Sequence, residues 1–112
     1  MVDEIDVSPE RVADLQREGA VQLIDVREDY EWEAGRIAGA RHLELARVAA
    51  EAATIDRDLP VVFYCRVGSR SGMAAQAFRG AGYEAYSMAG GLAAWDERGL
   101  GLEPEGGTVA DH

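Results

Sequence analysis

Cysteine is nearly absent from the 112-residue chain, which contains Cys65 alone. An internal disulfide is therefore impossible, and a small secreted scaffold stapled by disulfides is excluded. One cysteine and two histidines, His42 and His112, do not form a cluster with the ligand spacing of a zinc site. We therefore expect neither a metal centre nor a bound cofactor.

Long apolar runs and basic residues are also scarce. No run approaches the length of a transmembrane helix, and the acidic stretch from Met1 to Pro9 lacks the apolar segment of a signal peptide. A cytoplasmic location is the resulting expectation. The chain has 11 basic and 21 acidic residues, which gives a formal net charge of -10. Such a surface repels nucleic acid and anionic lipid, so we expect neither as a partner.

Strand-like and helix-like stretches alternate along the chain, which indicates an α/β fold. We expect three layers, with a central, mostly parallel five-stranded sheet and helices on both faces. The domain should span 1–100, and the segment 101–112, rich in Gly, Glu and Pro, should be a flexible tail. The expected strands are 5–7, 21–26, a short one within 37–43, 61–64 and 83–88. The expected helices are 9–18, 28–34, 44–53, 71–79 and 92–98, with Met73, Ala74, Ala77 and Phe78 on the buried side of the fourth.

Cys65 directly follows the most hydrophobic run, 61–64, which suits a central parallel strand. In such folds ligands bind beyond the carboxyl ends of the strands. The polar loop from Arg66 to Arg70 contains Gly68 and can curl, so its backbone N–H groups can form an anion-binding nest before the next helix. The helix dipole and the two arginines favour a thiolate there. An inert core cysteine would more commonly lie within a strand or on an apolar helix face, so a reactive cysteine is favoured.

These residues resemble a known family. The segment Cys65-Arg66-Val67-Gly68-Ser69-Arg70, followed by Ser71, closely resembles the active-site loop of rhodanese domains. Three other segments resemble motifs of that family in the same order: 23–28, 35–40 and 88–95. The resemblance spans about 5–98. Arg36 stands where the family usually has histidine, and we expect that position to be structural.

The resemblance implies a sulfurtransferase in which Cys65 attacks a small anionic donor such as thiosulfate and carries the sulfur as a persulfide. Backbone N–H groups of the loop would stabilise the persulfide, and the side chains of Arg66 and Arg70 would help to bind the donor. The implied substrate- and persulfide-binding residues are Arg66, Val67, Gly68, Ser69 and Arg70.

Four residues outside the loop are expected to support it structurally: Asp25, Arg27, Gly90 and Gly91. We expect Arg27 to pair with Glu28 or Glu31, and the two glycines to form a turn beside the loop. Trp95 should face the core, and His42 should be structural.

The single cysteine has a mechanistic consequence under this hypothesis. No second thiol can resolve a persulfide within the chain. The sulfur must therefore pass to an external acceptor, such as cyanide in an assay, a small thiol or a cysteine of a partner protein.

Two other functions remain open. Dual-specificity phosphatases of the cell-cycle type and arsenate reductases place five residues between the cysteine and the arginine of a similar loop. Four residues separate Cys65 from Arg70, and this narrower loop favours sulfur over a tetrahedral oxyanion. A rhodanese-like regulatory or protein-binding module with a redox-sensing Cys65 is the second alternative, and reversible oxidation at low peroxide would distinguish it.

Overall fold

The computed structural model describes residues 4–112 and contains one parallel five-stranded sheet. The strand order is β1-β5-β4-β2-β3, and every pairing between these strands is parallel. The expected α/β fold with a central parallel sheet is confirmed. The strands are β1 (Asp6–Val7), β2 (Gln22–Asp25), β3 (Arg41–His42), β4 (Val61–Tyr64) and β5 (Ala85–Met88).

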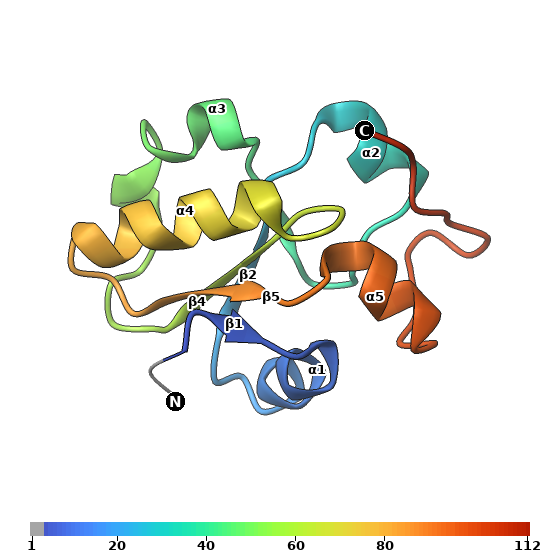
Figure 1. Cartoon of the computed structure of the whole chain (residues 1–112), viewed down its shortest axis with the longest axis horizontal. Helices are drawn as coiled ribbons and strands as arrows, with labels where there is room; N and C mark the ends of the chain where they lie inside the picture. The colour runs from blue at the N-terminus through green and yellow to red at the C-terminus, as the bar shows by residue number, and fades with distance from the viewer. Residues whose placement is uncertain (1–3) are drawn as a thin grey trace.

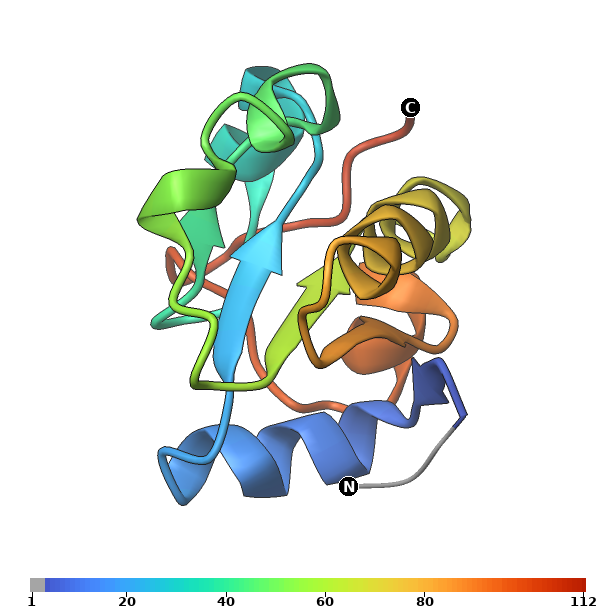
Figure 2. The same cartoon turned by 90° about the vertical axis from the view of Figure 1, so that its left-hand side faces the viewer.

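Helices cover both faces of this sheet, as Figures 1 and 2 show. Helices α1 and α5 pack together on one face, and α3 and α4 pack together on the other. Helix α2 follows the carboxyl end of β2. The helices are α1 (Pro9–Arg17), α2 (Asp29–Ala34), α3 (Leu45–Val48), the short 3₁₀ helix η1 (Ala52–Thr54), α4 (Ser69–Gly80) and α5 (Gly91–Glu97).

The central strand β4 divides the core into two clusters because side chains alternate along a strand. Val62 and Tyr64 belong to the cluster that also contains Trp95, which is buried as expected. Phe63 and Cys65 belong to the cluster on the α4 side. All of β4 is buried, so the strand forms a fixed base from which Cys65 leaves the sheet.

The single helix expected over 44–53 is wrong, because the chain forms α3 and η1 with a break between them. An alanine-rich sequence favours helix, but a short helix also needs an apolar face packed against the core. Val48 is the one buried residue of α3, while Ala49 and Ala50 are exposed. Packing therefore supports only one turn of α-helix.

Helix α4 begins at Ser69, two residues earlier than expected, so Arg70 lies in its first turn. The expected buried side is partly wrong, because Met73 is 57% exposed and Ala77 is also exposed. The helix packs through Ser71, Ala74, Ala75 and Phe78 instead. A serine counts as polar in a sequence pattern, but Ser71 is buried and hydrogen-bonded to Ser87. The buried face of α4 therefore includes Ser71.

The segment 101–112, expected to be a flexible tail, runs back beside α2 (Figure 1). The backbones of Arg36 and Glu103 form two hydrogen bonds, and the Thr108 N–H donates to the Ala34 carbonyl at 2.8 Å. A Cβ on Gly35 would clash with the Thr108 carbonyl oxygen, so the two segments are in close contact. These contacts define the path of the segment, and its flexibility stays a prediction.

Candidate active site at the carboxyl end of β4

Cys65 lies just beyond the carboxyl end of β4 and is 1% exposed. Its Sγ accepts hydrogen bonds from the backbone N–H groups of Gly68 at 3.1 Å and of Ser71 at 3.4 Å. Gly68 has φ of +113°, a conformation that suits glycine, and it is the N-cap of α4. The chain thus curls around the sulfur, which faces the positive end of the α4 dipole.

Two buried hydroxyl groups extend this contact. Ser71 Oγ lies 3.4 Å from Cys65 Sγ and 2.7 Å from Ser87 Oγ, which comes from β5. Ser71 Oγ also donates to the Gly68 carbonyl at 3.2 Å, and both serine side chains are fully buried. Ser87 was missed in the sequence, although a polar residue inside an otherwise apolar central strand is a signal that could have identified it.

Arg70 and Glu31 form an ion pair beside the loop. The Arg70 guanidinium donates to both carboxylate oxygens of Glu31, at 2.7 and 3.0 Å. Burial alone would raise the pKa of Glu31, but the hydrogen bonds from Arg70 and from the Glu28 backbone, with the charges of Arg70 and Arg27, hold it below its ordinary value. The same pair raises the pKa of Arg70. Glu31 was not predicted as a partner of the loop.

Arg27 pairs with Asp25, so the expected pairing with Glu28 or Glu31 is wrong. Its guanidinium donates to both Asp25 oxygens, with the shortest contact at 2.6 Å, and also to the Gly35 carbonyl at 2.7 Å. Both side chains are fully buried. Desolvation would lower the pKa of Arg27, but Asp25 raises it overall. A buried charge needs a desolvated partner close by, and Asp25, two residues away at the end of β2, provides it.

The glycine pair lies against the loop, at the N-terminus of α5. Gly90 and Gly91 have φ of +72° and +61°. The next two residues donate backbone hydrogen bonds to the loop, Leu92 N–H to the Cys65 carbonyl and Ala93 N–H to the Arg66 carbonyl, at 2.8 and 3.0 Å. A Cβ on Gly91 would lie 2.5 Å from the Arg66 carbonyl group, so only glycine allows this approach.

The remaining loop side chains point outward. Val67 is 52% exposed and Ser69 is also exposed. Arg66 is 35% exposed, and its guanidinium lies 3.7 Å from the Asp111 carboxylate. The loop therefore surrounds the sulfur with backbone groups. Of its two arginines, Arg70 pairs with Glu31, and Arg66 lies near Asp111 of the C-terminal segment.

His42 and Arg36 occupy structural positions around Trp32. The His42 ring stacks on Trp32 with centroids 4.8 Å apart, and its Nε2 lies 2.7 Å from the Arg27 carbonyl. Arg36 lies over the same indole at 5.0 Å and donates to the Trp32 carbonyl. Arg36, which stands where the rhodanese motif usually has histidine, thus contacts α2 through Trp32 and stabilises its end.

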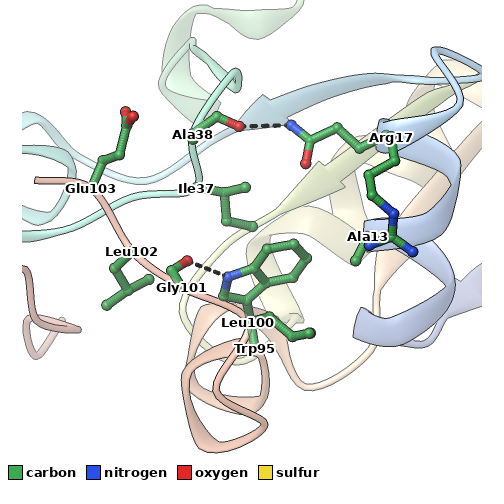
Figure 3. A pocket seen from close by; sticks show the side chains of 10 residues that line it. Ala13, Arg17, Ile37, Ala38, Trp95, Leu100, Gly101, Leu102 and Glu103 are labelled. Carbon is green, nitrogen blue, oxygen red and sulfur yellow. Dashed lines mark hydrogen bonds between the residues drawn. The ribbon is translucent and has the colours of Figure 1, made fainter. Parts of the chain in front are cut away.

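Three cavities among the described residues are considered; the smallest, of about 170 Å³, is lined by Ala49, Ala52, Ala77, Phe78, Ala81 and Tyr83. One, of about 290 Å³, lies at the loop edge and is lined by Val26, Glu28, Glu44, Leu45, Ala46, Arg70 and His112. Another, of about 320 Å³, lies between α1 and the segment 100–103, with Trp95 at its base (Figure 3). Its donors are engaged, because Trp95 Nε1 donates to the Gly101 carbonyl and Gln16 donates to the Ala38 carbonyl. Of these three cavities, the one at the loop edge alone includes a residue of the Cys65 loop, Arg70, so it is the candidate approach to the site.

One group of potential metal ligands appears among residues 4–112: Glu28, Glu31 and His112, whose ligand atoms lie within 4.8 Å of one another. Both oxygens of Glu31 already accept hydrogen bonds from Arg70. Cys65 is not part of this group.

Comparison with known proteins identifies relatives over most of the chain. The family described as "Rhodanese-like domain" matches residues 8–98. The chain is 37% identical over 90 residues to "Thiosulfate sulfurtransferase GlpE" of Pseudomonas aeruginosa, which covers 80% of this chain and 81% of that protein. It is 45% identical over 75 residues to "Uncharacterized protein YqhL" of Bacillus subtilis, over 66% of this chain and 60% of that protein. The match thus spans less than two thirds of the Bacillus relative.

Solved structures show the same fold. A rhodanese-related protein from Thermoplasma volcanium superimposes with a TM-score of 0.82, at 22% identity, over 88% of this chain and 97% of that one. A protein from Lactobacillus plantarum gives a TM-score of 0.81 at 25% identity, over 89% and 88% of the two chains. Among residues 4–112, no helix has both the length and the apolar character needed to cross a membrane.

Proposed function

Since the chain belongs to the rhodanese-like domain family, we propose that it is a sulfurtransferase that carries sulfane sulfur as a persulfide on Cys65. The observation that carries this proposal is the position of Cys65 Sγ, which accepts backbone hydrogen bonds from Gly68 and Ser71 at the N-terminus of α4. These donors stabilise negative charge on sulfur without a side chain that could compete as a nucleophile. The similarity to a Pseudomonas thiosulfate sulfurtransferase supports thiosulfate as a donor.

The proposed reaction has two displacements at sulfur. In the first, the Cys65 thiolate attacks the outer sulfur of thiosulfate, an S–S bond forms at Sγ, and sulfite leaves with the electron pair of the broken bond. In the second, an acceptor thiolate or cyanide attacks the outer sulfur of the persulfide, and Cys65 leaves as the thiolate. Each step exchanges one bond to sulfur for another, so the cycle needs no oxidant or reductant beyond the donor and the acceptor.

The role of the loop follows from its geometry. The Gly68 and Ser71 N–H groups donate to Sγ, and the Leu92 and Ala93 amides fix the Cys65 and Arg66 carbonyl groups. Donors held in place before the reaction need no reorganisation when charge appears on sulfur. Rigid backbone contacts thus act on the thiolate, which is both the nucleophile of the first step and the leaving group of the second.

Intact-mass measurement tests this proposal. The wild type and Cys65→Ser are incubated briefly with thiosulfate, mercaptopyruvate or a small persulfide, and then with cyanide. A gain of one sulfur atom in the wild type alone, removed by cyanide, is the expected result. No gain with any of the three donors would refute the proposed function and favour a binding module.

A further inference from the structure

The two arginines of the loop are already engaged by carboxylates. Arg70 gives two hydrogen bonds to Glu31, which is fully buried, and Arg66 lies 3.7 Å from Asp111, which is 99% exposed. The first pair is desolvated and bidentate, so an incoming anion does not displace it easily. The second is exposed and weak, but it still lowers the positive potential that a small anion meets at Arg66.

More carboxylates surround the same approach. Glu28 and Glu44, the N-cap residues of α2 and α3, both line the 290 Å³ cavity beside Arg70. Asp29, which follows Glu28, is 79% exposed but lies 3.6 Å from His42 Nδ1, so we do not count it among them. The nearby imidazole of His112 is itself bonded to Glu28, at 3.0 Å. The approach therefore carries two guanidinium groups, Arg66 and Arg70, and four carboxylates, Glu28, Glu31, Glu44 and Asp111, which we call the acidic rim.

Building on the proposed function, we infer that this acidic rim selects the sulfur acceptor: the thiol that takes sulfur from Cys65 is a cysteine on a basic protein surface. Clefts lined by charge of one sign raise the local concentration and the association rate of partners of opposite sign. The net charge of -10 extends this field over the whole domain. The arrangement disfavours small anionic acceptors, which the same field repels.

Two exposed apolar side chains complete the surface. Val67 is 52% exposed on the loop, next to Arg66, and Tyr30 is 48% exposed on α2. The Tyr30 hydroxyl donates to the Asp111 carbonyl at 3.1 Å, which places the ring beside the carboxylate that faces Arg66. Apolar and aromatic groups within a charged rim are typical of protein interfaces, where they supply contact area while the charges set orientation.

Competition between acceptor peptides tests this inference. Wild-type protein is loaded with sulfur at Cys65, loading is verified by intact mass, and transfer to two cysteine peptides of equal length is followed at low and high ionic strength. One peptide has lysines around its cysteine and the other has glutamates. Each rate is divided by that of the same peptide with a small neutral persulfide, because flanking charge also changes the thiolate fraction. We expect the lysine peptide to react at least about tenfold faster at low salt, and the preference to shrink at high salt.

Two matched double variants test whether the carboxylates of the acidic rim cause the preference for the lysine peptide. Glu44→Gln/Asp111→Asn removes two charges from the rim and should reduce the preference severalfold. Glu18→Gln/Glu97→Gln removes two exposed charges at the ends of α1 and α5 and should leave it nearly unchanged. Equal normalised rates for the two peptides, a preference for glutamate, or equal effects of both variants would overturn the inference while leaving a loaded Cys65 intact. Failure to load any sulfur would overturn the proposed function as well.

Discussion

The Glu31 carboxylate binds both terminal nitrogens of the Arg70 guanidinium, at 2.7 and 3.0 Å, and so connects α2 to the first turn of α4. We expect Glu31→Gln to lower the free energy of unfolding by about 2 kcal/mol, because it weakens hydrogen bonds to a charged group in a buried place. Urea unfolding measures the change. Glu33→Gln, an exposed position on the same helix, is the control and should change stability by less than about 0.5 kcal/mol. Equal effects would contradict the role given to Glu31.

The same pair predicts a dependence of stability on pH. The pKa of Glu31 is lowered in the folded protein, so its contribution is fully present above the ordinary glutamate value of about 4.3 and is lost as the pH falls through the lowered pKa. The stability difference between the wild type and Glu31→Gln should therefore be largest near pH 7 and narrow in acid. Urea midpoints measured from pH 7 down to pH 2 give this curve, and a constant difference would refute the assignment.

Gly91→Ala should disrupt the loop. The new Cβ would lie 2.5 Å from the Arg66 carbonyl group and 2.6 Å from the Cys65 carbonyl oxygen, and φ is +61°. We expect sulfur loading, followed by intact mass, to slow markedly, with a loss of stability of at least about 1 kcal/mol.

Gly72→Ala is the control for this change. No atom lies within 4 Å of its added Cβ, and the residue is inside α4. Because alanine favours helix, this variant should gain about 0.5–1 kcal/mol. Similar behaviour of the two variants would indicate that close approach at Gly91 is not what the loop requires.

The hydroxyl pair Ser71–Ser87 predicts a non-additive result. Removing either hydroxyl leaves the other buried without its partner at 2.7 Å, which should cost about 1–3 kcal/mol. Removing both avoids that penalty, so Ser71→Ala/Ser87→Ala should lose less stability than the sum of the two single changes. Denaturant unfolding of the four proteins measures this coupling. Additive losses would show that the hydroxyls act independently.

Asp111→Asn tests the charge beside Arg66. Removing an exposed carboxylate 3.7 Å from the guanidinium should lower the KM for thiosulfate by about two- to fivefold and leave kcat unchanged, which corresponds to the modest energy of an exposed ion pair. The effect should fade at high salt. Steady-state kinetics with cyanide as acceptor provide the measurement. A change in kcat with a constant KM would place Asp111 elsewhere in the cycle.

The fold and the position of Cys65 could be predicted because local signals agree with the tertiary structure. The run 61–64 is apolar on both faces, and the loop after it is polar, so the end of the strand is visible in the sequence. The side-chain partners could not be predicted in this way. Arg27 has several acids close to it in the sequence, whereas Arg70 has none between Asp58 and Glu84. Only the packed structure shows that Asp25 pairs with Arg27 and that Glu31, from a distant part of the chain, pairs with Arg70.

The same limit explains the other errors. Ser71 is counted as polar in a helical pattern, yet its bond with Ser87 turns it inward and leaves Met73 outside. Ala49 and Ala50 favour helix by propensity, but both are exposed, so no core packs against them. Contacts between residues far apart in the chain decided both cases, and such contacts leave little trace in a single sequence.

The stretch from α2 to Arg36 shares three backbone hydrogen bonds with the segment 103–108. Glu31 of α2 and Asp111, which follows the segment, supply the carboxylates that pair with Arg70 and Arg66. Segments joined in this way tend to open as one cooperative unit. Local opening would then release both arginines together, so an anion that binds only the released arginines would shift the opening equilibrium by mass action. The stability of this unit against local opening and the affinity of the two arginines for an anion are therefore linked. A substitution that stabilises the closed unit should weaken anion binding.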